Sequence, residues 1–279
     1  MGARTFYWMI GAAALASALP EAAESQVAAP VLTYADIADL ALSSPVAAHV
    51  RVGKAVPVKA AQAVGLRPGY TRLYVQAELV ALVKASEPLP NRLSYVVDLP
   101  QVGKGKAPKL SKGTELILLA HPVPGRPGEL RLAAPDAQLA YTSERAAQLR
   151  SIVAEARAAT PPPRVTGISR AFHVPGTVAG ESETQIFLST AERTPASLSV
   201  LRRPGAAPQW AVSLSEIVDE AATPPAPHTL LWYRLACGLP RALPAQSLSD
   251  AGANAREIQA DYRLILDRLG PCARSRARP

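Results

Sequence analysis

The stretch that decides the fold is YTRLYVQAELVALVK, residues 70–84. Its side chains alternate between polar and apolar, which is the period of a strand with one face on a core and one in water. The polar face would carry Arg72, Tyr74, Gln76 and Glu78, and the apolar face would carry Leu73, Val75, Ala77, Leu79, Ala81 and Val83. We therefore expect a long, curved strand over these residues.

Other strand-like segments surround this one. Val46–Val58 precedes it, and Arg92–Leu99, Glu115–Ala120 and a segment from Glu129 follow it. Glu115–Ala120 is apolar almost throughout, which predicts a strand that is buried on both faces. Helices are predicted on either side of these strands. The first begins at a Thr33–Asp36 capping pair and ends at Pro45, and the second runs over about Ser143–Ala159.

Five strands in this order predict a small closed β-barrel. The layout resembles the OB-fold, and most closely the netrin-type variant of secreted proteins, over about residues 32–159. The order of elements carries the resemblance, because no residue motif does. One departure is that the usual helix between strands three and four is replaced by a lysine-rich loop, and the helix follows strand five. The resemblance implies ligand binding through the barrel loops.

The second half predicts a β-meander with two helices after it. We expect strands over Ile168–Val174, Thr184–Thr190, Ser197–Leu201 and Trp210–Leu214, with Trp210, Val212 and Leu214 facing inward, and helices over Leu230–Cys237 and Ala255–Leu269. A proline run at 160–163 predicts a boundary. The expected fold class is α+β, mostly β. Its parts are an OB-like barrel domain over 32–159, a β-rich domain over 164–240 and a C-terminal helix with a basic, disordered tail over 241–279.

The N-terminus predicts export. Arg4 precedes an apolar run from Phe6 to Leu19, and Ala16-Ser17-Ala18 supplies a small-x-small cleavage pattern. We interpret residues 1–18 as a signal peptide, which places the mature protein in the periplasm or outside the cell and leaves it without a membrane span. The alternatives are an uncleaved anchor and a buried helix. As a whole, the chain resembles exported bacterial proteins.

The two cysteines, Cys237 and Cys272, are too few for a disulfide scaffold or a zinc site. In an oxidising compartment a lone pair of cysteines usually forms a disulfide. A Cys237–Cys272 bond would contribute roughly 3–4 kcal/mol by the chain-entropy estimate. The alternative is two separate buried thiols.

The net charge is +8, from 30 basic and 22 acidic residues. Its densest part is the loop GKGKAPKLSKG, which carries Lys104, Lys106, Lys109 and Lys112. These four lysines are candidates for binding a phosphate or an anionic polymer. A solvated hairpin connection is the alternative and the preferred interpretation, because no aromatic side chain interleaves the lysines as a stacking platform would require.

Catalytic motifs are weak. Ser182 lies in GESET, which lacks the second glycine of a nucleophile elbow and runs into a predicted strand. The four histidines stand singly, so we expect no metal site and no cofactor. His173 lies near Glu181 and Glu183 in the sequence, and a hairpin would bring them together. The acidic run from Glu216 to Glu220 fits either a cation site or a solvated helix start.

These observations lead to three hypotheses. The first is a non-catalytic binding or structural protein of the bacterial envelope, whose partner is an envelope protein or an anionic envelope polymer. The second is a periplasmic hydrolase or isomerase with a site near His173, Glu181 and Glu183. The third is polyanion or nucleic-acid binding by the basic barrel. The predicted signal peptide argues against nucleic acid as the ligand.

Overall fold

The computed structural model describes residues 2, 32–103, 105–215, 222–249 and 251–276. The predicted signal peptide, Lys104 and the acidic run from Glu216 lie outside these ranges, so export and the roles proposed for those residues stay predictions. Within the described ranges no helix has the length and apolar character needed to cross a membrane.

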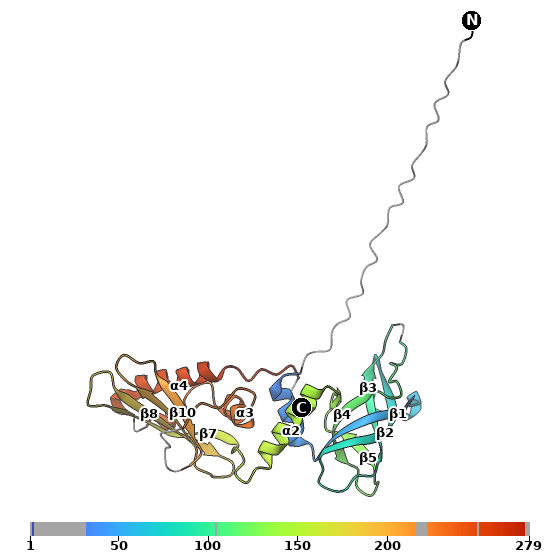
Figure 1. Ribbon diagram of the computed structural model, residues 1–279, viewed down its shortest axis with the longest axis horizontal. Helices are drawn as coiled ribbons and strands as arrows, with labels where there is room; N and C mark the ends of the chain where they lie inside the picture. The colour runs from blue at the N-terminus through green and yellow to red at the C-terminus, as the bar shows by residue number, and fades with distance from the viewer. Residues whose placement is uncertain (1, 3–31, 104, 216–221, 250, 277–279) are drawn as a thin grey trace. The chain divides into compact units, whose positions relative to one another are not determined.

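Five strands of the first half close into a barrel (Figure 1). They are β1 (Val46–Pro57), β2 (Tyr70–Lys84), β3 (Arg92–Pro100), β4 (Glu115–Pro122) and β5 (Glu129–Leu132). The strand order is β1-β2-β3-β5-β4, and β4 pairs back onto β1. The β3–β5 pairing is parallel and the others are antiparallel, so this is a mixed barrel that resembles the OB-fold. A short strand that the sequence did not indicate, β6 (Gln138–Ala140), is added to β4.

The alternation in β2 is confirmed over its first half. Leu73, Val75 and Ala77 are buried in the barrel, and Tyr74 lies outward. Beyond Leu79 the predicted apolar face is wrong at Ala81, which is exposed, whereas Val83 is half-buried against other apolar residues. The register of β1 against β2 shifts at this point, so a bulge breaks the alternation.

Strand β4 is buried on both faces, as its apolar run predicted. Leu116, Leu118 and Ala120 belong to the barrel interior. Ile117 and Leu119 point to the other side, into a second cluster of buried residues. This strand is therefore the wall that the two cores share.

The second core spans both halves of the chain. The helices α1 (Tyr34–Ser43) and α2 (Ser143–Ala156) pack in it together with the outer side of β4, and the same cluster continues into the second sheet. The buried residues thus form one cluster on both sides of the predicted boundary at 160–163, and the whole of Leu32–Pro279 behaves as one compact unit. The division into domains at the proline run stays a prediction.

The second sheet is the antiparallel meander that the sequence predicted. Its strands are β7 (Val165–Pro175), β8 (Ser182–Thr190), β9 (Ser197–Arg202) and β10 (Gln209–Ser213), side by side in that order. Trp210 and Val212 are buried, but Leu214 is exposed because β10 ends before it. The helices α3 (Leu230–Gly238) and α4 (Ala255–Leu269) pack against this sheet, and short 3-10 helices cover Ala60–Gln62, Ala245–Leu248 and Gly252–Asn254.

The C-terminal segment departs from its prediction. The expected disulfide between Cys237 and Cys272 is present and joins α3 to the end of the chain. The segment after it was expected to be a disordered tail, which is wrong for Arg274–Arg276. These residues are held by ion pairs and hydrogen bonds to Asp36, Asp39 and Asp136, which lie far away in the sequence. We call residues 272–276 the C-terminal strap.

Candidate functional site

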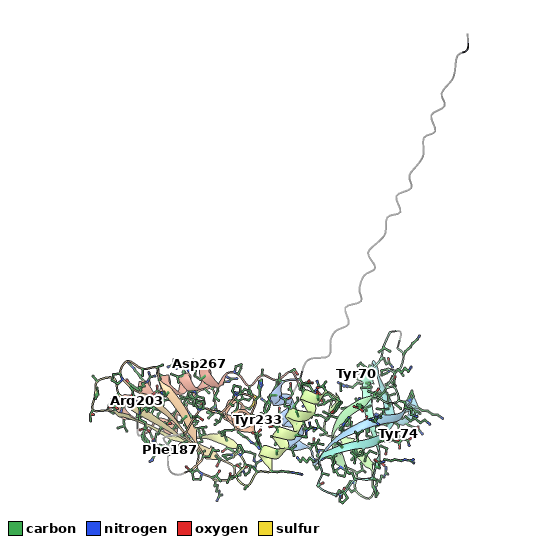
Figure 2. The ribbon with its side chains drawn as sticks, in the orientation of Figure 1. Tyr70, Tyr74, Phe187, Arg203, Tyr233 and Asp267 are labelled. Atoms are coloured by element: carbon green, nitrogen blue, oxygen red, sulfur yellow. A yellow bond between two sulfur atoms is a disulfide. The ribbon has the colours of Figure 1, made fainter. Side chains whose placement is uncertain are left out.

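A cleft lies beside the C-terminal strap. Its volume is about 560 Å³, within the range of small-molecule sites. Side chains from α1, the loop after β5, the start of β7, α3 and the strap line it. Figure 2 labels Tyr233, which marks its position on α3. We call it the arginine cleft, because its lining includes Arg164, Arg234, Arg274 and Arg276.

Three of these arginines form ion pairs with carboxylates. The pairs are Arg164 Nε with Glu192 Oε1 at 2.8 Å, Arg274 Nε with Asp39 Oδ2 at 2.5 Å, and Arg276 Nε with Asp136 Oδ2 at 2.6 Å. For Asp136 and Glu192, the hydrogen bonds from their arginines hold the pKa below its usual value. The charges of these three guanidinium groups are therefore balanced within the protein.

The fourth arginine, Arg234, has no such partner. Its Nε is buried and makes no hydrogen bond, and within the described ranges no carboxylate lies at ion-pair distance from it. Its guanidinium lies 5.9 Å from the centroid of the Tyr233 ring. Burial lowers the pKa of Arg234, and the charge of Glu192 partly opposes this. A guanidinium stays protonated in proteins, so the cleft contains a partly buried positive charge with no described carboxylate at ion-pair distance.

The strap forms one wall of the cleft and is firmly attached. Asp36, at the N-terminal end of α1, accepts hydrogen bonds from the backbone N–H groups of Ser275 and Arg276 and from the Ser275 hydroxyl. On the next turn of α1, Asp39 pairs with Arg274 and accepts a short hydrogen bond from the Tyr233 hydroxyl. Burial and this bond raise the pKa of Tyr233 to about 12. The carboxylate and the phenol in the cleft are thus both engaged.

The lysine loop lies elsewhere. Lys106, Lys109 and Lys112 are exposed on the connection between β3 and β4, and Lys104 lies outside the described residues. The three described lysines do not line the arginine cleft and form no ion pair with the described carboxylates. Anion binding by this loop stays a prediction.

The histidine predicted for catalysis is part of a hydrogen-bonded network. His173 Nδ1 lies 2.8 Å from Thr184 Oγ1, and this hydroxyl donates to Asp261, whose carboxylate is paired with Arg202. Thr184 and Asp261 are fully buried.

The two glutamates near His173 have other neighbours. Glu183 accepts a hydrogen bond from Gln185, and the Glu181 side chain lies against Gly176. The structure therefore joins His173 to Thr184 and Asp261 rather than to either glutamate.

Sequence reasoning missed the arginine cleft. Its arginines lie directly before β7, on α3 and in the strap, and no spacing connects them. The disulfide was the one signal available, since it predicts that α3 and the end of the chain lie side by side. No protein-family model matches the sequence, and a search of curated proteins finds no similar chain.

Proposed function

We propose that the protein is an exported, non-catalytic binding protein that holds an anionic group of its ligand in the arginine cleft. The observation that carries this proposal is Arg234, a partly buried guanidinium in the arginine cleft with no described carboxylate at ion-pair distance. A buried charge is costly unless it is paired, and a bound anion would supply the missing partner.

The chemistry of the cleft supports binding rather than catalysis. A general base must be free to take a proton, and a nucleophile must be activated by such a base. Asp39 accepts from both Arg274 and Tyr233, and the raised pKa of Tyr233 keeps its hydroxyl protonated at neutral pH. The sulfur of Cys237, which also lines the cleft, is bonded to Cys272. These groups are arranged to hold a ligand.

Export is supported by the sequence at the N-terminus and, more weakly, by the disulfide. We expect protein isolated from the envelope or the medium to begin at Leu19, directly after the small-x-small pattern. N-terminal sequencing tests this expectation. A native chain that begins at Met1 would contradict it.

Binding is tested with simple anions as probes. Phosphate, sulfate and acetate are titrated into the full mature chain at constant ionic strength, and heat release and the thermal midpoint are recorded. We expect at least one of these anions to bind and to stabilise the fold, because a ligand that binds only the native state raises the free energy of unfolding.

The matched variants are Arg234→Gln and Arg203→Gln. Arg203 is exposed on the second sheet, away from the cleft, and is labelled in Figure 2. Arg234→Gln should abolish anion binding while near-UV circular dichroism shows an intact fold, and Arg203→Gln should bind as the original chain does. Equal loss of binding in both variants would refute the proposal. The absence of anion binding by the original chain would refute it too.

The barrel surface supports a second candidate, which is polyanion binding. Val56, Tyr74 and Val96 are exposed and directly paired across β1, β2 and β3, so they form an apolar row. A shallow hollow beside Tyr74 also includes Lys54 and Arg92. Retention on heparin should fall steeply with salt, and replacing Lys106, Lys109 and Lys112 with glutamine should weaken it. Retention that does not change with salt would exclude this candidate.

A further inference from the structure

We propose that the disulfide between Cys237 and Cys272 is a site of reversible exchange with a small-molecule thiol, which becomes bonded to Cys237 while Cys272 leaves as a thiolate. This proposal goes beyond anion binding and does not depend on it. It depends on three properties of the described residues, which are the unequal surroundings of the two sulfur atoms, the position of Cys237 at the cleft and the attachment of the strap.

The sulfur of Cys272 has a cationic donor beside it. Nη1 of Arg274 lies 2.8 Å from Cys272 Sγ. The other edge of the same guanidinium, formed by Nε and Nη2, binds the carboxylate of Asp39. Asp39 opposes a negative charge on the sulfur from that edge, but it also accepts from the Tyr233 hydroxyl, and Nη1 donates to the sulfur directly. A thiolate at Cys272 would therefore gain a charge-assisted hydrogen bond.

The sulfur of Cys237 has less support for a negative charge. Cys237 lies in the last turn of α3, where the carbonyl ends of the helix disfavour an anion. Arg234 lies one turn earlier on the same helix, but among the described residues neither it nor any other donor forms a hydrogen bond with Cys237 Sγ. A disulfide breaks faster toward the sulfur that is the better leaving group. Cys272 is therefore the expected leaving group.

The exchange step is balanced without an external oxidant. A thiolate R–S⁻ attacks Cys237 Sγ and forms a new R–S–Sγ bond. The bond between the two protein sulfurs breaks, and its electron pair stays on Cys272 Sγ, beside Arg274. Cys237 is half-buried and borders the cleft, whose volume of about 560 Å³ has room for a small thiol. We therefore expect the attacking thiolate to approach from the cleft.

The strap does not depend on the disulfide alone. Asp36 accepts from the backbone N–H groups of Ser275 and Arg276, and Arg276 pairs with Asp136. These interactions remain when the bond between the sulfurs breaks, so the freed thiolate stays close to the mixed disulfide. It can then attack Cys237 Sγ, re-form the original bond and release the small thiol. The exchange is therefore reversible.

Trapping of the mixed disulfide tests the direction of exchange. The oxidised full mature chain is incubated with glutathione at pH 7.5, quenched with N-ethylmaleimide and mapped by peptide mass spectrometry. We expect glutathione on Cys237 and maleimide on Cys272, roughly fivefold or more in excess of the opposite pattern. Glutathione mainly on Cys272, equal amounts on both, or no adduct while near-UV circular dichroism stays native would overturn the proposal.

Single-thiol variants test the cause. Cys237→Ser leaves the Cys272 thiol and Cys272→Ser leaves the Cys237 thiol, and each is alkylated with iodoacetamide at pH 6 and pH 9. The ratio of the two rates reports the thiolate fraction and removes differences in exposure. At pH 6 an unperturbed thiol is almost fully protonated, so this ratio should be about tenfold higher for Cys272 than for Cys237.

Variants of Arg274 in the Cys237→Ser chain test the role of its charge. Arg274→Gln should lower the ratio about tenfold, and Arg274→Lys should keep most of it, because lysine retains the charge. Arg203→Gln is the matched control and should leave the ratio unchanged, since Arg203 is exposed and does not line the cleft. Near-UV circular dichroism shows whether each variant is folded.

The outcomes separate this inference from the proposed function. If an anion binds through Arg234 but glutathione does not add preferentially to Cys237, the proposed function stands and this inference is wrong. If glutathione adds to Cys237 and no anion binds, the inference stands and the proposed function is wrong. A Cys272 thiol that is no more reactive at pH 6 than the Cys237 thiol would overturn the inference in either case.

Discussion

Replacing Asp36 with asparagine should destabilise the protein and remove part of its sensitivity to acid. Asp36 is fully buried at the start of α1 and holds the C-terminal strap. Its carboxylate accepts from Thr33 N at 2.9 Å, Ser275 N at 3.0 Å, Ser275 Oγ at 2.7 Å and Arg276 N at 3.2 Å. The Thr33 hydroxyl proton can go either to Asp36 or to the carbonyl of Ala273, which lie at 2.9 and 2.8 Å.

The magnitude follows from the pKa. Burial alone would raise the pKa of Asp36, but hydrogen bonds from Ser275 and Thr33 outweigh burial and lower it from 3.8 to about 2. Because the folded pKa is below the unfolded one, the ionised carboxylate stabilises the fold above the unfolded pKa, and this stabilisation is lost as the pH falls through about 2. One pKa unit corresponds to about 1.4 kcal/mol, so the drop is worth about 2 kcal/mol.

Asparagine cannot reproduce this acceptor, because it has one oxygen and its amide nitrogen would face donors. At pH 6 we expect Asp36→Asn to lower the free energy of unfolding by about 3 kcal/mol, the scale of a lost charged hydrogen bond in a buried site. Between pH 6 and pH 2 the difference between the original chain and the variant should shrink by about 2 kcal/mol, because only the original chain loses the ionised carboxylate.

Urea unfolding followed by tryptophan fluorescence measures both quantities, with the disulfide kept oxidised. Trp232 is buried and donates to the carbonyl of Leu269, so its emission should report the loss of the fold. Asp267→Asn is the matched control. Asp267 is exposed on α4 and is labelled in Figure 2, and its replacement should change stability by less than about 0.5 kcal/mol at either pH. A difference between the original chain and Asp36→Asn that stays constant from pH 6 to pH 2 would refute the reasoning.

Three other predictions concern stability. Replacing both cysteines with alanine should lower the free energy of unfolding by about 4 kcal/mol, because the disulfide joins residues 35 apart in the sequence. The calorimetric unfolding midpoint should then fall by roughly 8–16 °C, and a fall under about 2 °C would contradict this prediction. Arg202→Gln should cost about 3–5 kcal/mol in urea unfolding, because it leaves the buried carboxylate of Asp261 without its ion pair, and adding Asp261→Asn should recover part of that loss. Gly128→Ala should destabilise more than Gly125→Ala. Both residues have positive φ, but only at Gly128 would an added Cβ lie 2.7 Å from the Arg92 carbonyl oxygen. Equal urea midpoints for the two variants would show that this close approach costs no stability.

The elements that the sequence predicted correctly have local signals. The alternation in residues 73–78 and the apolar run of β4 reflect burial that neighbouring residues impose, so both could be read directly from the chain. The disulfide was predictable because two cysteines allow only one pairing. The exposed Leu214 and the bulge in β2 were not predictable, since the end of a strand and its register depend on the strand beside it.

The strap and the cleft could not be predicted for a different reason. Arg274–Arg276 form a short polar, basic segment, which locally favours disorder. Its order comes from carboxylates on α1 and on the loop before β6, which lie well over a hundred residues earlier in the sequence. Ion pairs over such separations leave no periodicity in the sequence. The same holds for Arg234, which differs from its three neighbours in the cleft because none of the described carboxylates lies at ion-pair distance from it.

The contrast within the cleft is the strongest argument that it binds something. The strap is fixed by more interactions than a chain end needs, namely a disulfide, two ion pairs and several hydrogen bonds to Asp36. Arg274 and Arg276 in this wall meet the carboxylates of Asp39 and Asp136, and the buried carboxylate of Asp36 is held by backbone N–H groups and hydroxyls. Arg234 differs from these two arginines, because no described carboxylate lies at ion-pair distance from it. It lies on α3, which the disulfide joins to the strap. Under the proposed function, a ligand from solution would balance the charge of Arg234, and the fixed wall beside it means that such a ligand would enter a preformed site.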